Sequence, residues 1–395
     1  MKRNQFHSFT VKINRTSLKK IVALTIVGII ALFVFTGMLT SFEPGYGLAS
    51  NQVHEWASDI KGEHFVHLLG MENAYFAQVL PKDSEPLSVS NLAFRVATSI
   101  NPDDPRSLLG RELPGFALFD GRIVVAGEGT DYTNLPVESA PPMEVLMAER
   151  EATQESLAML EQLEREGEKL AGTTDGRKVV HIIHSHNYES FLPELETDVP
   201  NEAHHSKINI TLVGEKLSQE LEKRGIGVEV ERRDIQANLS ERGWSYPRSY
   251  DASREFIKEA MAQENDLEFF FDLHRDSLPR DRTTVTINGE EFARTFFVIG
   301  GNHNDHKHNL HLAEELHRLL EENYPGLSRG VIVKEGALTN GRFNQDLSKQ
   351  SILIEVGGIE NSLEETYRSA EALADVFADY YWQADAVSGQ EGEEE

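Results

Sequence analysis

Residues 177–384 alternate short runs rich in β-branched and aromatic residues with longer amphipathic segments. Strands are predicted at 178–184, 227–234, 267–274, 294–301 and 351–358. Helices are predicted at 209–225, 250–263, 309–325 and 361–383. Because a helix between two strands returns the chain to the start of the next strand, this alternation favours parallel pairing. We therefore expect an α/β fold with a largely parallel central sheet flanked by helices.

The N-terminal residues are of a different kind. Residues 21–40 form an uncharged apolar run, about the length of one bilayer span. Six Lys and Arg residues precede it, and no acidic residue appears before Glu43. The positive-inside rule then predicts a single transmembrane anchor at 21–40, with 1–20 in the cytoplasm and the rest of the chain outside. A signal peptide cleaved near "GLAS" (47–50) is the alternative.

Three further segments complete the predicted domain organisation. Residues 41–135 form a smaller N-terminal extracytoplasmic region. Residues 136–176 form a linker that contains a charged helix at 144–170. The domain at 177–384 follows, and 385–395 is an acidic tail whose last residues, "SGQEGEEE", are predicted to be disordered.

Composition restricts the chemistry open to this chain. It has 65 acidic and 38 basic residues and a formal net charge of −27. Nucleic acid is therefore not an expected partner, because binding to phosphates requires a basic surface. There is no cysteine, so a metal site would have to use His, Asp or Glu ligands.

Ionisable residues gather where three predicted strands end, in "IIHSHNYES", "FFFDLHRDS" and "LIEVGG". Parallel strands bring their carboxyl ends to one edge of a sheet, where α/β proteins bind ligands. One cleft could thus collect His184, His186, Glu189, His274 and Glu355. Without cysteine, such a set suits zinc with three protein ligands and an open position for water. Zinc with a nearby carboxylate to move a proton is the chemistry of amide hydrolysis.

His184 has two interpretations. It lies two residues before His186, so in an extended strand both side chains would point to the same face. It could equally be a hydrogen-bonded histidine of the core.

Four stretches resemble the stage II sporulation protein P family: "HSHNYESF", "HHSKINITLVGEKL", "FDLHRDS" and "NQDLSKQSILIEVGG". The resemblance extends over most of the chain, including the anchor and "DPRSLLGRELPGF", and is most specific at 180–365. The catalytic domain of this family is similar to zinc-dependent N-acetylmuramoyl-L-alanine amidases. The resemblance thus implies an amidase-like domain at 177–384, in a peptidoglycan hydrolase with amidase and endopeptidase activities.

The resemblance also implies a place and partners. The protein would be a single-pass protein of the cell membrane at the sporulation septum. There it would act in engulfment of the forespore, together with stage II sporulation proteins D and M.

Carried over by position, the resemblance makes His186 and His274 zinc ligands and Glu355 the general base. The related amidases take their third ligand from a Glu shortly before the first helix. This chain has "AHHSKIN" (203–209) there, which offers His204 or His205, and His205 is the preferred ligand. Glu189 is the rival ligand; otherwise it would serve as an additional acid/base or as a carboxylate that orients a ligand.

Two other classes of function stay open. The chain could be a non-catalytic septal scaffold that keeps an amidase-like fold, a role that would not require Glu355. It could also be a zinc peptidase that acts on proteins.

Overall fold

The protein is described by a computed structural model. It describes residues 121–391 apart from 138–141, 149, 168–173, 175 and 337–338, together with Val66, His67 and Tyr75. The chain divides into two compact units, Met1–Pro102 and Asp103–Glu395, and the fold below is that of the second. The predicted anchor at 21–40 lies outside the described residues. Within the described ranges, no helix is both long and apolar enough to span a membrane.

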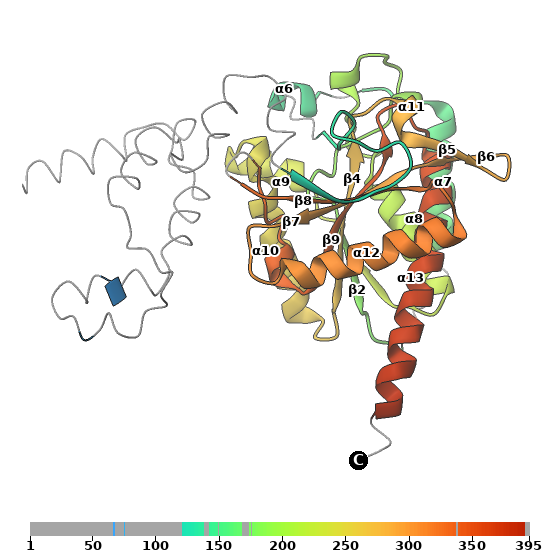
Figure 1. Ribbon diagram of the computed structural model, residues 1–395. Coiled ribbons are helices and arrows are strands. Elements are labelled where there is room, and N and C mark those ends of the chain that lie inside the picture. Colours follow the sequence, from blue (N-terminus) through green and yellow to red (C-terminus); the bar gives the residue numbers. More distant parts are fainter. Residues whose placement is uncertain are drawn as a thin grey trace, which may run out of the picture. The chain divides into compact units, whose positions relative to one another are not determined.

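A seven-stranded sheet forms the centre of the second unit, in the order β1-β8-β7-β9-β4-β2-β3 (Figure 1). The strands are β1 (Gly121–Ala126), β2 (Val180–Ile183), β3 (Val228–Val230), β4 (Phe269–Asp276), β7 (Thr295–Gly300), β8 (Ser328–Lys334) and β9 (Gln350–Gly358). The pairs β2–β3, β2–β4, β4–β9 and β7–β8 are parallel. The pairs β7–β9 and β1–β8 are antiparallel. The predicted α/β fold with a largely parallel sheet is confirmed.

The sequence interpretation missed a β-hairpin that comes directly before β7 and changes the direction in which β7 enters the sheet. It consists of β5 (Thr284–Ile287) and β6 (Glu290–Ala293). Its two-residue turn is Asn288–Gly289, and both residues have positive φ, 54° and 90°. Asn-Gly is the preferred pair for such tight turns. After the hairpin the chain enters β7 in the opposite direction to β9.

The edge strand β1 was also not predicted. It falls within 41–135, the segment assigned from the sequence to a separate N-terminal region. In the structure β1 pairs with β8, which was likewise not predicted as a strand. Part of that segment therefore belongs to the central sheet.

Helices cover both faces of the sheet (Figure 1). The α-helices are α6 (Met143–Leu146), α7 (Gln154–Gly167), α8 (Thr211–Lys223), α9 (Ile235–Arg242), α10 (Ser249–Gln263), α11 (Arg280–Thr283), α12 (His306–Asn323) and α13 (Leu363–Glu391). Short 3-10 turns are η3 (Leu192–Glu194), η4 (Pro200–Glu202), η5 (Tyr246–Arg248) and η6 (Gln345–Leu347). α13 extends past the predicted end at 383, so the "SGQEGEEE" tail is helical as far as Glu391.

Successive residues of the strands pack on opposite faces, as the pleat of a strand requires. On β4, Phe269 and Phe271 join the core formed with α8, α12 and α13. Phe270, between them, joins a second core with α9 and α10. The face toward α10 also carries the residues of the candidate site.

The predicted charged helix at 144–170 is in fact two helices, α6 and α7. Thr153 begins α7, because its Oγ accepts a hydrogen bond from the backbone N–H of Ser156 at 3.2 Å. Just before it, Ala152 pairs with Leu195 in an isolated β-bridge. The single-helix prediction was wrong because these residues pair with a loop of the α/β domain.

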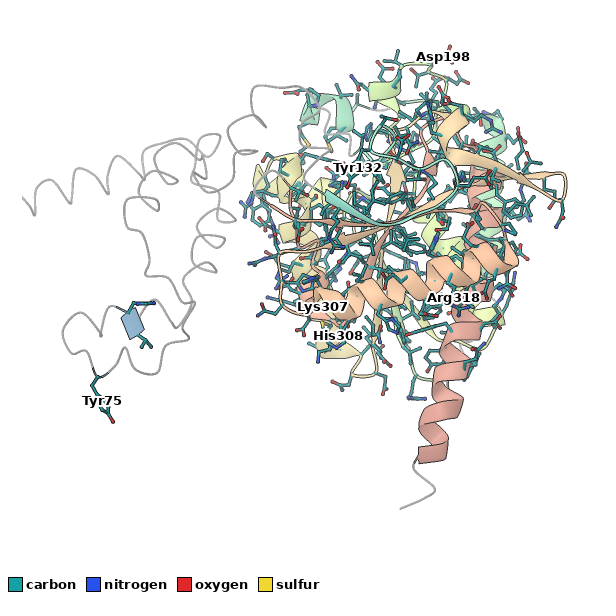
Figure 2. The ribbon with its side chains drawn as sticks, viewed as in Figure 1. Tyr75, Tyr132, Asp198, Lys307, His308 and Arg318 are labelled. Carbon is teal, nitrogen blue, oxygen red and sulfur yellow. The ribbon has the colours of Figure 1, made fainter. Side chains whose placement is uncertain are left out.

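The histidine-rich stretch before and within α12 faces solvent at several positions. Lys307, His308 and Arg318 are exposed along this helix (Figure 2), and the side chain of His308 is 60% exposed. On the opposite side Leu312 and Leu316 are fully buried against the sheet. This part of α12 is therefore an ordinary amphipathic helix.

Candidate metal centre

Three neighbouring parallel strands position the candidate site residues. The register of β2 and β4 aligns Ile183 with Asp272, and that of β4 and β9 aligns His274 with Glu355. Paired residues of adjacent strands point to the same face, and so do residues two apart on one strand. Asp272, His274 and Glu355 therefore share the face of the sheet that α10 covers.

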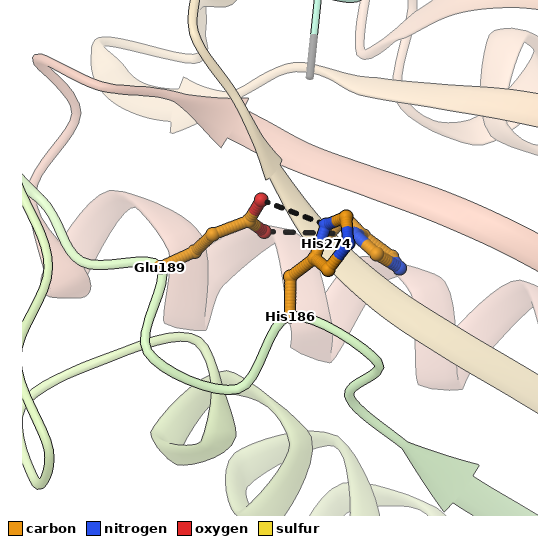
Figure 3. Close-up of side chains that lie close together, drawn as sticks. All are labelled: His186, Glu189 and His274. Atoms are coloured by element: carbon orange, nitrogen blue, oxygen red, sulfur yellow. Dashed lines mark ion pairs between the residues drawn. The ribbon is translucent and has the colours of Figure 1, made fainter. Parts of the chain in front are cut away.

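His186, Glu189 and His274 form one buried group (Figure 3). The Nδ1 atom of His186 lies 3.4 Å from Oε1 of Glu189, and the Nδ1 atom of His274 lies 3.6 Å from Oε2. One ligand atom from each residue can be chosen so that all lie within 4.8 Å of one another. None of the three residues is more than 2% exposed.

The donor atoms of this group fit a zinc ion. Two ligand atoms about 2.0–2.1 Å from a zinc ion in tetrahedral geometry lie about 3.4 Å apart. The two separations, 3.4 Å from His186 to Oε1 of Glu189 and 3.6 Å from His274 to Oε2, are close to that value, and one ligand atom per residue can be chosen within 4.8 Å of the others. Among the described residues, neither Nδ1 atom has a hydrogen-bond partner of good geometry, although both are buried. Two imidazoles and one carboxylate are the ligand set of many zinc hydrolases.

The histidines and carboxylates of this group change one another's pKa values. Burial alone would raise the pKa of Glu189, but His186 and His274 hold it well below its usual value. Burial would lower the pKa of His274, but Asp272 and Glu189 raise it well above its usual value. The two carboxylates thus favour a positive charge at this position, which a bound cation would supply.

Aromatic rings restrict the orientation of the two histidines. His186 stacks on Tyr246 of η5, with ring centroids 4.4 Å apart. Tyr250 of α10 meets His186 edge-on at 5.2 Å and lies parallel to His274 at 6.1 Å. Both imidazoles are therefore held between the sheet and the segment that begins α10.

Glu189 reaches the group from the loop that follows β2. The turn brings its backbone N–H within 3.1 Å of the His186 carbonyl. The backbone N–H of Arg275 donates to Oε2 of Glu189 at 2.9 Å. An isolated β-bridge between Glu189 and His204 joins this loop to the next. The carboxylate is thus fixed by contacts on β4 and on the 203–209 segment.

The structure places His205, the preferred third ligand, in a different role. Its Nε2 lies 3.1 Å from the carbonyl oxygen of Arg150. Its Nδ1 accepts hydrogen bonds from the backbone N–H groups of Lys207 and Ile208 at 3.0 and 2.9 Å. Both ring nitrogens are therefore occupied by backbone groups, and Glu189 takes the place beside His186 and His274 that the sequence interpretation gave to His205.

His184 directly follows β2, which ends at Ile183, so the alternation of an extended strand does not continue to His186. His184 instead packs on Gly214 of α8, and burial lowers its pKa to about 3. It is a neutral histidine of the core.

The contact between His184 and Gly214 gives a prediction about stability. A Cβ at Gly214 would overlap Nε2 of His184, which is itself only 2% exposed. Gly214→Ala is expected to destabilise the domain by about 1–3 kcal/mol, because overpacking a core forces side chains out of their preferred rotamers. Urea unfolding followed by circular dichroism measures the change.

A double-mutant cycle provides the control for this prediction. His184→Ala removes the ring that the new methyl group would meet. Gly214→Ala should therefore cost less in the His184→Ala background than in the unmodified protein. Equal costs in both backgrounds would show that the two residues do not compete for space.

Asp272 is a site residue that the sequence interpretation missed. Its Oδ1 lies 3.1 Å from Nε2 of His274, the ring nitrogen that faces away from Glu189. The available signal was the Asp-Leu-His spacing within a strand, since residues two apart lie on the same face. Metal-binding histidines often contact a carboxylate through the second ring nitrogen.

Comparison with known proteins agrees with the motifs seen in the sequence. The family model described as Stage II sporulation protein P (SpoIIP) matches residues 103–378. Stage II sporulation protein P of Bacillus subtilis (strain 168) is 46% identical over 390 residues, which cover 97% of this chain and 96% of that protein. The resemblance inferred from the motifs is confirmed, and the chain belongs to the stage II sporulation protein P family.

Proposed function

We propose that this protein is a zinc-dependent peptidoglycan hydrolase that cleaves the amide between N-acetylmuramic acid and the first L-alanine of the stem peptide. The observation that carries the proposal is the buried group of His186, Glu189 and His274 at the carboxyl ends of parallel strands. In this proposal Glu189 is the third ligand in place of His205. Cleavage of peptide cross-links is a second activity that the family resemblance suggests.

A zinc ion in this group would polarise the amide carbonyl and lower the pKa of water. Glu355 is the proposed general base, because its register places it beside His274 on the same face of the sheet. Its carboxylate would accept a proton from the attacking water and pass it to the nitrogen of L-alanine as the C–N bond breaks. The products are a muramic acid carboxylate and a stem peptide with a free α-amino group.

The proposed location follows from the N-terminal sequence and the family. Residues 21–40 would anchor the protein in the cell membrane and hold the α/β domain outside, next to the wall. Membership of a sporulation family supports action at the sporulation septum during engulfment. Stage II sporulation proteins D and M are the proposed protein partners.

Removal of the metal tests the mechanism. The full chain, purified and stripped with a chelator, should release stem peptide from isolated peptidoglycan at less than about one hundredth of the original rate. Addition of zinc should restore release, which chromatography of the soluble peptides measures. A new N-terminal L-alanine identifies amidase cleavage, and other new termini identify cleavage of cross-links or stems.

Three outcomes would contradict the proposal. Full activity in metal-free protein would exclude the zinc mechanism. No release by zinc-loaded protein would instead favour the septal scaffold, and digestion of a protein substrate would favour a zinc peptidase.

A further inference from the structure

Asp272 connects His274 to other buried polar groups. Its carboxylate lies 3.1 Å from Nε2 of His274 and is only 6% exposed. The backbone N–H of Ser185 donates to Oδ1 at 2.8 Å, and the Ser185 hydroxyl donates to Oδ2 at 2.6 Å. Because β2 ends beside Asp272, the first residues after the strand are placed to make these bonds. The orientation of the carboxylate is therefore fixed.

The hydrogen bonds continue from Ser185 into α10. The hydroxyl oxygens of Ser185 and Ser253 are 2.8 Å apart, and both residues are completely buried. A serine hydroxyl carries a single proton. When Ser185 donates its proton to Asp272, its oxygen can accept the proton of Ser253, whose hydroxyl also lies 3.3 Å from the carbonyl oxygen of Tyr250. The α10 hydroxyl thus supports the orientation of Ser185 that serves Asp272.

Asn344, in the loop before β9, completes the series. Its Nδ2 donates to Oγ of Ser253 and to the carbonyl oxygen of Tyr250, both at 3.0 Å. Asn344 thus links Ser253 to the backbone at the start of α10. Three side chains from separate parts of the chain, Ser185, Ser253 and Asn344, thus lead to one acceptor, Asp272, which faces Nε2 of His274.

The backbone at this loop is strained. Phe343 and Asn344 have φ of 50° and 58°, in the left-handed region that a bulky residue such as Phe rarely adopts. Such conformations persist only where the surroundings enforce them, and they gather at functional sites. Phe343 is 2% exposed and meets Tyr250 edge-on at 5.5 Å, while Tyr250 lies against His274. The strained pair thus reaches the metal group through both the hydrogen bonds and the aromatic ring.

We propose that these side chains orient the ring of His274 for metal binding, and we call them the Asp272 network: Asp272, Ser185, Ser253 and Asn344. A carboxylate oxygen 3.1 Å from Nε2 favours the tautomer with its proton on Nε2, although the contact is not aligned as a hydrogen bond among the described residues, and this tautomer leaves the lone pair of Nδ1 for the metal. The members are positioning residues, because they act on the metal only through His274. The inference rests on the proposed function.

Zinc affinity of the full chain tests the network without recourse to activity. Zinc is titrated against a chromophoric chelator that competes for the metal. Asp272→Ala should weaken zinc binding by about 10- to 100-fold, as is typical when such an orienting group is lost. Ser185→Ala should weaken it by about three- to tenfold, since the backbone N–H of residue 185 still holds Asp272. Ser185→Thr retains the hydroxyl and should restore most of the affinity.

Ser369→Ala is the matched control. Ser369 is also a fully buried serine, but its hydroxyl donates to the carbonyl of Ala293, away from the network. Its zinc affinity should stay within about twofold of the unmodified protein. If Asp272→Ala fails to fold, the zinc affinities of Ser185→Ala, Ser185→Thr and Ser369→Ala test the network. A loss in Ser185→Ala alone supports it, and equal affinities in all three overturn it.

Zinc binding by the unmodified protein and by the variants distinguishes the Asp272 network from the proposed function. If the unmodified protein binds zinc and the Asp272→Ala and Ser185→Ala proteins bind it equally tightly, the network is overturned and the proposed function stands. An equal loss in Ser369→Ala would also overturn the network, because the effect would then reflect general destabilisation. An unmodified protein that binds no zinc overturns both.

Discussion

Glu355→Gln is expected to lower stem-peptide release about 10²- to 10⁴-fold, the usual contribution of a general base. Glutamine has nearly the shape of glutamate, so the fold and the neighbouring His274 should be little disturbed. It has no basic oxygen that could take the proton of water at neutral pH. The rate of release from purified peptidoglycan measures the effect, and zinc content is measured on the same samples.

Zinc content separates loss of the base from loss of the metal. Glu355→Gln protein should still bind zinc like the unmodified protein. Glu364→Gln, which removes the same charge from an exposed residue of α13, is the control and should keep full activity. Unchanged release from the Glu355→Gln protein would remove Glu355 as the base.

The second large effect concerns the third ligand. Glu189→Ala is expected to weaken zinc binding by at least about 10²-fold. Zinc-binding free energies of about 10–16 kcal/mol shared among four ligands assign roughly 3 kcal/mol to each. The loss should be larger still because the buried His186 would no longer have a carboxylate beside it, and His274 would keep only Asp272. Chelator competition and zinc stoichiometry after dialysis measure it.

His205→Ala is the matched test of the alternative ligand. Its ring bonds to backbone groups of Arg150, Lys207 and Ile208, so the substitution should loosen that loop and leave zinc stoichiometry unchanged. The opposite result, with zinc lost from His205→Ala and kept by Glu189→Ala, would reinstate His205 as the ligand.

Most elements of the α/β domain could be predicted because the spacing of apolar residues along a segment reflects which of its faces are buried. "FFFDLH" and "SILIEVGG" are buried on both faces in the structure, as continuous apolar runs indicate. The direction of β7 could not be predicted in this way. It depends on the β5–β6 hairpin. The Asn288–Gly289 pair indicates the tight turn itself, but not that the strand after the hairpin pairs antiparallel with β9, far along the chain.

The sequence by itself determined the fold class, the family and the candidates at the strand ends, His186, His274 and Glu355. The fold class and the strand ends follow from local patterns, since strand periodicity and parallel pairing bring those ends together, and the family follows from the resemblance of the motifs. Tertiary structure decided which residue joins the two histidines. Glu189 is held by the N–H of Arg275, 86 residues later, and His205 is held by the carbonyl of Arg150, 55 residues earlier. Contacts so distant along the chain exist only after folding, which is why the position carried over from the related amidases favoured His205.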